Sequence, residues 1–432
     1  MEFIALLVFV SILVLILYGY PVAFTLGGLS VLYAICFIEP SNYAALPPRI
    51  MGIMTNYVLI AVPLFIFMGI MLERSGLAES LLETMAILFG SVKGGLAISV
   101  VIVGALLAAS TGIVGATVVT MGLISLPTMI KRGYQAELAT GTIASSGTLG
   151  QIIPPSVVLV LLGSVLNVSV GDLFRAAIVP GLLLVVMYIL YILIIARLRP
   201  EIAPVIPKEE IDAFKSDGYI PRLIKAFVLP LLLIVAVLGS IFAGIASPTE
   251  AAGVGAMGAI ILTIFQGKFS LDVLQKVMRE TTFLTSMVFV ILIGATVFSF
   301  VFRQLEGDLF LIELIQNSNL SPNAFLFLVM VVVFIAGFFI DFIEIIFILV
   351  PIVAPIFIAL EIDLVWIGIL LAVNLQTSFL TPPFGFSLFY LKGVAPDSIT
   401  TNQMYRGIIP FLIIQAFVLL LIVLFPNIIR LI

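Results

Sequence analysis

The chain has 432 residues, of which 62% are hydrophobic and 10% are charged, with a formal net charge of −4 at pH 7. A typical soluble domain is about 25% charged, so these few charges exclude a water-soluble enzyme. One helical span needs about 20 apolar residues, and the composition therefore predicts an all-α polytopic membrane protein. Because the chain has no histidine and one cysteine, Cys36, we expect no His-based catalysis, no internal disulfide and no organic cofactor. The small net charge argues against a nucleic-acid partner.

Apolar stretches alternate with short polar connections along the whole chain. In chain order they lie at about 2–19, 22–38, 57–72, 94–130, 134–165, 176–196, 226–246, 251–266, 281–302, 322–358, 362–391 and 407–429. The first has no basic residue before it, so we interpret it as a retained span rather than a signal peptide. The stretches 94–130 and 322–358 are too long for one span at about 1.5 Å per residue. Each has small, polar or charged residues in its middle, so each is either two spans or one re-entrant hairpin.

The distribution of basic residues favours the hairpins. The polar segment 197–225 holds six cations, and the positive-inside rule places it in the cytoplasm. If both long stretches are hairpins, 15 of the 19 cations fall on the cytoplasmic side. The remaining cations are Arg49, Arg175, Arg303 and Arg430. The sequence thus predicts ten spans, two hairpins and both termini in the periplasm.

An internal repeat supports this topology. The interval from Pro127 to Pro355 equals the interval from the pair Pro154-Pro155 to the pair Pro382-Pro383. Each repeat would hold five spans and one hairpin, and because five is odd the second copy must be inverted. The predicted first repeat is 1–200, with scaffold spans in 2–72, hairpin 94–130, broken helix 134–165 and span 176–196. A cytoplasmic linker, 201–225, precedes the second repeat, 226–432, with scaffold spans in 226–302, hairpin 322–358, broken helix 362–391 and span 407–429.

The Pro-Pro pairs predict a break in one helix of each repeat. A proline removes a backbone donor and pushes the preceding residue out of the α region, which frees carbonyl groups before the pair. Free carbonyls and hydroxyls suit Na⁺ better than a soft metal, and the helix N-terminus after the break suits an anion. We expect substrate contacts from the polar residues Ser146, Thr148, Gln376, Thr377 and Ser378. The alternative is a plain proline kink whose hydroxyls bond to their own helix.

The hairpin tips are the second candidate. Ser110 begins a small-residue tip in the first repeat, whereas Gly337, Asp341 and Glu344 mark the tip in the second. Carboxylates at membrane depth are costly and usually serve an ion or substrate path, so Asp341 is a predicted Na⁺ partner. The alternative is a protonated structural carboxyl. We expect Glu250 to cap a helix, and the amphipathic stretches 77–90 and 305–318 to lie at opposite membrane interfaces.

Several motifs resemble a known family over essentially the whole chain. They are STGIVGATVVTMGLISLPTMIKRGY, SSGTLGQIIPPS, GFFID with the later Pro351 and Pro355, and NLQTSFLTPPFGFS. The chain resembles the large, DctM-like membrane subunit of tripartite ATP-independent periplasmic (TRAP) transporters. It is most similar to the branch associated with mannitol, chloroaromatic or 2-oxo-acid uptake.

The resemblance implies an elevator mechanism in a bacterial or archaeal inner membrane, driven by Na⁺. It also implies a soluble periplasmic binding protein that delivers an organic acid, and a small four-helix, DctQ-like subunit that is not fused to this chain. The first Na⁺ site would join Ser110 to Ser145, Ser146 and Gly147. The second would join Gly337 and Asp341 to Gln376, Thr377 and Thr381.

The leading hypothesis is therefore a sodium-coupled transporter subunit for a small carboxylate. One alternative is a self-sufficient dicarboxylate or ion carrier of the same architecture, without a binding protein. Another is a non-transporting membrane scaffold subunit.

Overall fold

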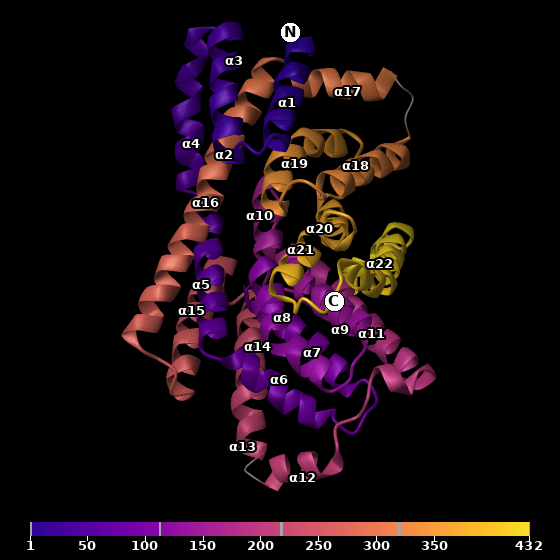
Figure 1. Ribbon diagram of the computed structural model, residues 1–432. Coiled ribbons are helices and arrows are strands. Elements are labelled where there is room, and N and C mark those ends of the chain that lie inside the picture. Colours follow the sequence, from indigo (N-terminus) through magenta and orange to yellow (C-terminus); the bar gives the residue numbers. More distant parts are fainter. Residues whose placement is uncertain (1, 112–113, 217–218, 318–320, 432) are drawn as a thin grey trace.

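The computed structural model describes residues 2–111, 114–216, 219–317 and 321–431 (Figure 1). Regular structure within these ranges is helical throughout. The elements of the first half are α1 (Glu2–Leu17), α2 (Val22–Phe24), η1 (Thr25–Leu29), α3 (Ser30–Phe37), η2 (Pro40–Ala45), α4 (Leu46–Met54), η3 (Tyr57–Ile60), α5 (Ala61–Arg74), α6 (Leu77–Leu88), α7 (Gly95–Thr111), α8 (Val114–Lys131), α9 (Ala136–Thr148), η4 (Leu149–Gln151), α10 (Val157–Leu166) and α11 (Val170–Leu198).

A short connection leads to the second half. Its elements are η5 (Pro200–Ile202), α12 (Lys208–Ser216), α13 (Tyr219–Leu223), η6 (Ile224–Val228), α14 (Leu229–Phe242), α15 (Pro248–Phe265), α16 (Leu271–Gln304), α17 (Gly307–Asn317), α18 (Pro322–Ala336), α19 (Phe342–Ala359), α20 (Leu364–Leu380), α21 (Phe386–Val394), α22 (Thr401–Leu424) and η7 (Pro426–Arg430).

The predicted polytopic membrane protein is confirmed at the level of helix length and composition. In the described ranges, eight helical segments are long and apolar enough to cross a membrane. They are η3 with α5, α8, α11, the run α13 to α14, α15, α16, α19 and α22. Six further apolar helices are shorter, among them α7 and α18 in the predicted hairpins. The predicted count of ten spans therefore depends on how these shorter helices lie in the bilayer.

The two halves have matching helix boundaries. The helix α8 begins at Val114 and ends at Lys131, and α19 begins at Phe342 and ends at Ala359. The start of α19 follows the start of α8, and its end follows the end of α8, by the same interval that separates the two Pro-Pro pairs. The same interval separates the start of α9 from the start of α20. Both Pro-Pro pairs have a cis peptide bond. The helices interrupted at these pairs are the two that the prolines predict.

Several boundaries differ from the predicted ones. The predicted span 281–302 is the C-terminal part of α16, which begins at Leu271 because the Ser270 hydroxyl caps it by accepting a hydrogen bond from Val273 N at 3.1 Å. The stretch 39–56, for which the sequence predicts no element, contains η2 and α4, and the predicted linker contains α12 and α13. The expected cap at Glu250 is confirmed: it forms a capping box with Ser247.

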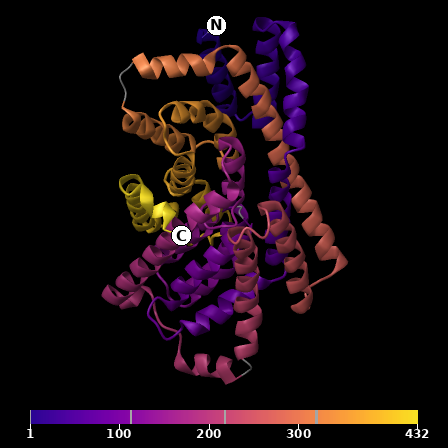
Figure 2. The ribbon, with the colours of Figure 1, turned by 180° about the vertical axis from the view of Figure 1, so that it is seen from behind.

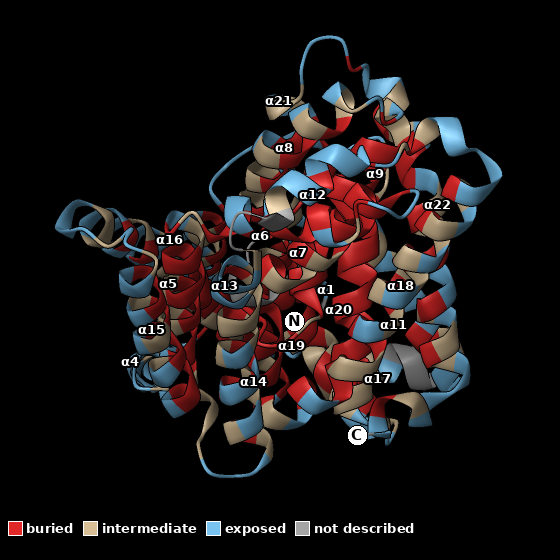
Figure 3. Cartoon of the chain, turned by 90° about the horizontal axis from the view of Figure 1, so that it is seen from below, coloured by how far each residue is buried: buried red, intermediate tan, exposed pale blue. Residues whose placement is uncertain are grey.

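The helices are arranged around a buried middle. In both side views, α16 lies alongside α4 and α5 over much of the length of the molecule (Figures 1 and 2). The amphipathic helix α17 lies near the top of Figure 1, whereas α6 lies in the lower half. Seen from below, buried residues gather in α7, α9 and α20, and exposed residues lie on the outer faces of α14, α15 and α22 (Figure 3). These exposed faces are apolar, as lipid-facing helices require.

Small residues allow the closest helix crossings. A Cβ atom on Gly141 of α9 would overlap the carbonyl of Gly407 of α22, and one on Gly407 would overlap the carbonyl of Glu137. A Cβ atom on Gly294 of α16 would lie 2.5 Å from Ala23 O. Close backbone approach through glycine is typical of helix packing in membranes, where apolar burial alone provides no attraction between helices.

The segment between the halves is docked on the base of the first predicted hairpin. Gly94 N donates to Ala203 O at 3.1 Å. The Arg132 guanidinium donates two hydrogen bonds to the Glu210 carboxylate of α12, at 3.1 Å and 2.5 Å. This bidentate pair holds the pKa of Glu210 below its ordinary value. The segment is therefore attached just before the start of α7 and just after the end of α8.

Candidate functional site

The two helix breaks lie in the most enclosed part of the molecule. From Leu138 to Gln151, α9 and η4 are buried without interruption, and so is α20 from Ile367 to Leu380. The polar residues Ser145, Ser146, Thr148 and Gln376 are each 0% exposed. The structure thus brings the polar residues predicted from the two Pro-Pro motifs into the interior, although they belong to different halves of the chain.

One hydrogen bond joins the two breaks directly. Gln376 Nε2 of α20 donates to Thr148 Oγ1 of α9 at 3.4 Å. The two residues are separated by 228 positions, the interval that relates the Pro-Pro pairs. Equivalent positions of the two halves therefore meet at this contact. Ser387, at the start of α21, adds a second bridge because its hydroxyl donates to Ala144 O at 3.1 Å.

The predicted hydroxyl groups also bond to their own helices. Ser145 Oγ donates to Gly141 O at 2.7 Å, and Thr377 Oγ1 donates to Val373 O at 2.8 Å. The hydroxyls of Ser146, Thr148, Ser378 and Thr381 donate in the same way to carbonyls three or four residues earlier. These bonds are the ones that the kink alternative predicts. They use only the hydroxyl proton, so each oxygen keeps lone pairs for a cation or another donor.

The first predicted hairpin packs tightly against the first break. A Cβ atom on Gly104 of α7 would lie 2.6 Å from Ser146 Oγ. Cβ atoms on Gly147 and Gly150 would overlap Val118 of α8 and the carbonyl of Ala108 of α7, respectively. The side chain of Ser110, predicted to join this site, lies outside the described residues. The structure thus shows the first hairpin contacting the first break at Gly104, Ala108 and Val118, which lie near Ser110 in the sequence.

The second predicted hairpin makes the corresponding contact with the second break. A Cβ atom on Gly337, at the end of α18, would overlap the Ser378 hydroxyl of α20. Aromatic rings extend this contact, since Phe342 and Phe379 have centroids 6.0 Å apart. Gly337, a predicted ion-site residue, therefore meets Ser378, a predicted substrate contact. Their counterparts one repeat interval earlier are Ala109 and Gly150, and in the first half Gly150 packs against Ala108, the residue before Ala109.

Asp341 lies at the N-terminus of α19. Its Oδ1 accepts a hydrogen bond from Phe342 N at 2.7 Å, which caps the second arm of the hairpin. Glu344 follows in the first turn of the same helix. Among the hydrogen bonds of the described residues, none joins Asp341 to Gln376, Thr377 or Thr381. In the described structure, Asp341 therefore caps α19 and is not hydrogen-bonded to the residues predicted to share its ion site, which lie at the second break.

The prediction from sequence missed Gln151. This residue ends η4 and is 0% exposed, yet neither its Nε2 nor its Oε1 has a hydrogen-bond partner among the described residues. Gln376 Oε1 is likewise without a partner there. An unpaired buried polar group costs about 1–3 kcal/mol, so such groups call for an explanation, of which an absent ligand is one. The sequence feature that could have indicated Gln151 is its polar side chain within an apolar stretch, three residues before the proline pair.

The site has the chemistry of hydroxyl, amide and carbonyl groups. Within the described ranges, no three His, Cys, Asp or Glu side chains gather as around a transition metal. Amide N–H groups can donate to a carboxylate, and amide, hydroxyl and backbone oxygens can face a hard cation. Two broken helices meeting in the interior of a helical membrane protein are typical of secondary transporters.

Comparison with known proteins agrees with this class. Residues 9–428 match the family described as "Tripartite ATP-independent periplasmic transporter, DctM component". The chain belongs to this family, and the resemblance expected from its motifs is confirmed. It is a multi-pass membrane protein of the bacterial inner membrane and a transporter component rather than an enzyme.

Similar proteins include large permeases named for different solutes. The C4-dicarboxylate TRAP transporter large permease protein DctM of Pseudomonas aeruginosa is 32% identical over 93% of this chain and 92% of its own length. The ectoine permease TeaC of Halomonas elongata is 30% identical over 96% and 95%. The sialic acid permease SiaM of Vibrio cholerae is 29% identical over 95% and 93%.

A solved structure has a related fold. The YdaH transporter of Alcanivorax borkumensis superposes with a TM-score of 0.64, covers 90% of both chains and is 14% identical in sequence. At this identity the likeness concerns the fold alone. It supports the all-helical membrane architecture described above.

Proposed function

We propose that this chain is the large membrane subunit of a sodium-coupled importer of a small organic acid. The observation that carries the proposal is the buried meeting of the two breaks at Thr148 and Gln376. Beside this contact, Gln376 Oε1 of the second break has no partner among the described residues, and both polar side-chain atoms of Gln151 in the first break are also unpaired there. Unpaired amide groups at a meeting of two broken helices are suited to a carboxylate and its coupling ion.

The proposed ion sites are those that the family resemblance implies. The first would use Ser110, Ser145, Ser146 and Gly147, and the second Gly337, Asp341, Gln376, Thr377 and Thr381. The packing of each hairpin against its break supports both assignments, because carbonyl and hydroxyl oxygens from two segments then come close together. Substrate would be bound by Ser146, Thr148, Gln376, Thr377 and Ser378, to which we add Gln151.

We further propose an inverted repeat and an elevator mechanism. In Figure 1, α1 starts at the top and the run from α13 to α14 starts at the bottom, and α17 and α6 lie toward opposite ends. The helices α7 and α8 lie in the lower half of this view, and α18 and α19 in the upper half. This exchange of ends supports inversion. The moving unit would comprise α7 to α10 and α18 to α21, with ten spans in all and both termini in the periplasm.

The proposed substrate class is broad because the relatives at about 30% identity are named for C4-dicarboxylates, sialic acid and ectoine. A small organic acid fits the amide donors and the helix N-termini after the breaks. A 2-oxo acid is the narrower candidate. TRAP large permeases work with a small membrane subunit and a periplasmic binding protein. The named isethionate permease DctMQ of Oleidesulfovibrio alaskensis is a fused form.

Reconstitution into proteoliposomes tests the function. The full chain, its small subunit and its binding protein would be combined, and uptake of radiolabelled organic acids measured with an inward Na⁺ gradient or with K⁺ in its place. We expect uptake only with Na⁺ and only with all three proteins. Equal uptake in K⁺ buffer would contradict sodium coupling. Uptake by this chain alone would select the self-sufficient carrier, and no uptake of any acid under all conditions would favour the scaffold alternative.

A further inference from the structure

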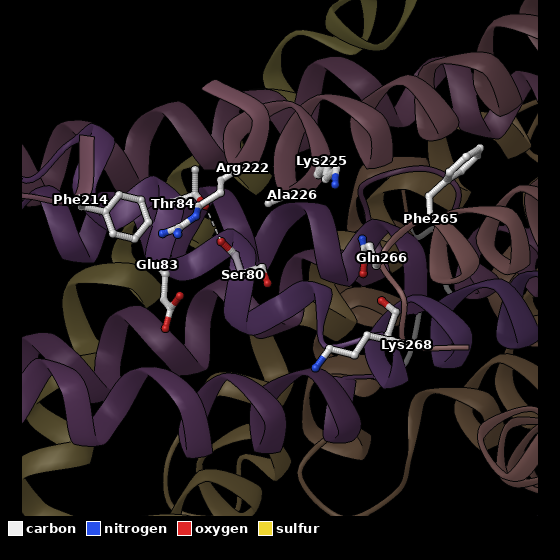
Figure 4. Close-up of a pocket in the computed structure, with 11 residues that line it drawn as sticks. Ser80, Glu83, Thr84, Phe214, Arg222, Lys225, Ala226, Phe265, Gln266 and Lys268 are labelled. Carbon is white, nitrogen blue, oxygen red and sulfur yellow. Dashed lines mark hydrogen bonds between the residues drawn. The ribbon is translucent and has the colours of Figure 1, made fainter. Parts of the chain in front are cut away.

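A polar cavity is lined by residues of α6, α12, α13, η6 and the end of α15, and by no residue of the two helix breaks (Figure 4). In Figure 1, α6, α12 and α13 lie in the lower half of the molecule. The volume of the cavity is about 300 Å³, within the range of small-ligand sites. Three segments form it: the turn before α6 with α6 itself, the run from α12 to η6, and the turn between α15 and α16. The cavity therefore joins segments of both halves of the chain.

Positive charge dominates the cavity. Among the described residues, Arg222, Lys225 and Lys268 line it, against one lining carboxylate, Glu83. In Figure 4, Gln266 lies between Lys225 and Lys268. Neither lysine forms an ion pair with a carboxylate of the described ranges, in contrast to Lys276, which pairs with Asp272 at 2.7 Å. Two lysines on one cavity that share no ion pair with the described carboxylates favour binding of an anion.

Hydrogen-bonding groups complete the lining. Ser80 and Thr84 present one face of α6 to the cavity, and Gln266 adds an amide. The Thr84 hydroxyl donates to Ser80 O at 2.7 Å. The Arg222 guanidinium lies 5.1 Å above the Phe214 ring, which holds it at the cavity. A planar guanidinium, two ammonium groups and an amide are the donors that bind a phosphate group in proteins.

Large apolar side chains in the cavity lining, or close to lining residues in the sequence, are exposed. Phe265 lines it and is 69% exposed, and Ile220 and Ile224, beside Arg222 and Lys225, are 68% and 45% exposed. Large apolar side chains at this exposure are suited to acyl chains rather than to water. A headgroup site next to such residues fits a phospholipid better than a free anion.

We propose that this cavity binds the phosphate headgroup of an anionic phospholipid. The six cations of segment 197–225, together with Lys268, belong to the side predicted to face the cytoplasm, whose leaflet carries anionic lipids. The bound lipid would fasten α6 to α13 and to the turn after α15. The site is separate from the transport site and does not depend on the substrate or on sodium coupling.

A lipid titration of the purified full chain tests the proposal. Binding of phosphatidylglycerol would be measured by native mass spectrometry, and the thermal unfolding midpoint followed in parallel, with phosphatidylcholine and inorganic phosphate as the other probes. We expect phosphatidylglycerol to bind and to raise the midpoint, because a ligand of the native state stabilises it. Lys225→Gln and Lys268→Gln should each weaken binding roughly fivefold, and the double variant roughly 25-fold.

The matched control is Lys276→Gln, an exposed lysine of α16 outside the cavity. It should bind phosphatidylglycerol as tightly as the unchanged protein. Unaltered binding in the double variant, or equal weakening in the control, would overturn the site. If inorganic phosphate raised the unfolding midpoint as much as phosphatidylglycerol does, the cavity would bind phosphate in general, and the proposal of a lipid ligand would be wrong. Since all three lysines are exposed, the variants should fold, and the mass measurement verifies intact protein.

Discussion

Gln376 donates a hydrogen bond to Thr148 at 3.4 Å, and both side chains are fully buried. Each residue lies on the helix that its own Pro-Pro pair interrupts, and 228 positions separate the two. The contact therefore lies where equivalent positions of the two halves meet. A solute bound at this point, as we propose, would be contacted by both halves at once, as at the repeat interface of secondary transporters.

Gln151 provides a test of the site that separates function from stability. We expect Gln151→Leu to abolish most uptake while leaving the free energy of unfolding unchanged or about 1–3 kcal/mol higher, because the amide has no described partner to lose. Uptake in proteoliposomes and thermal unfolding in detergent measure the two effects.

The control for this variant is Gln415→Leu. Gln415 is also buried, but its Nε2 donates to Tyr188 Oη at 2.7 Å, and these residues belong to α22 and α11 rather than to the broken helices. It should lose stability and keep its Na⁺ dependence. If the Gln151→Leu variant were less stable but still took up solute at the normal rate, the amide would be a structural group rather than part of the site.

Asp341→Asn separates the charge of this residue from its capping role. Asparagine is as good an N-cap as aspartate, so α19 should keep its first turn while the proposed ion site loses its carboxylate. We expect the Na⁺ concentration for half-maximal uptake to rise at least roughly tenfold, since a charged ligand contributes about 1.4 kcal/mol or more. Asp363→Asn is the matched control, because Asp363 caps α20 by accepting from Val365 N at 2.8 Å. Equal Na⁺ dependence in both variants would contradict the assignment of Asp341.

Gly337→Ala tests the contact of the second hairpin with its break. The added methyl group would overlap the Ser378 hydroxyl, and such overpacking costs about 1–3 kcal/mol. We expect a lower unfolding midpoint, restored in part by the second change Ser378→Gly, which reproduces the glycine found at Gly150. Gly393→Ala has open space around it and should be neutral or slightly stabilising. A stable Gly337→Ala protein would show that the two segments separate readily.

Glu361 occupies a backbone conformation that favours glycine. It lies just after α19 with φ +56°, and its counterpart Gly133, just after α8, has φ +80°. A left-handed residue with a side chain costs about 1 kcal/mol, and part of this is recovered through the unfolded chain. We expect Glu361→Gly to raise stability by about 0.5 kcal/mol and Gly133→Ala to lower it by about 1 kcal/mol. Thermal unfolding of both variants measures this, and a loss of stability in Glu361→Gly would contradict it.

The pair of Arg132 and Glu210 should make stability depend on acid pH. The guanidinium lowers the pKa of Glu210 from its ordinary value of 4.5. The stabilisation is therefore present above this ordinary value and is lost as the pH falls through the lower, folded pKa. The Glu210 side chain is 49% exposed, so the effect at pH 7 is no more than about 1 kcal/mol.

Glu210→Gln tests this dependence. The variant should be less stable than the unchanged protein at pH 7, and the difference should shrink as the pH falls below 4.5 and vanish once the pH lies below the lowered, folded pKa of Glu210. Glu209→Gln, at the neighbouring position, controls for the loss of charge. A pH-independent difference would mean that packing rather than the ion pair fastens α12.

Much of the local structure was predictable because it depends on neighbouring residues. A proline pair inside a helix removes backbone donors and interrupts the helix, so the breaks at Pro154-Pro155 and Pro382-Pro383 could be predicted. Pro47-Pro48 lies in the first turn of α4, where proline is tolerated, and causes no break. Ser247 with Glu250 forms the expected capping box. The start of α16 was missed because its first turns are polar and extend beyond the apolar stretch. Gln151 was missed because nothing in the linear sequence shows that an amide is buried without a partner.

By itself, the sequence determined that this is a polytopic helical membrane protein of the DctM family with two broken helices. These properties follow from apolar length, charge placement and proline chemistry, which act within a few turns of the chain. Only the tertiary structure decided that Thr148 meets Gln376, that Gly337 touches Ser378 and that Lys225 and Lys268 share a cavity. These contacts depend on how helices distant in sequence pack against each other, and backbone approach at single glycines sets that packing.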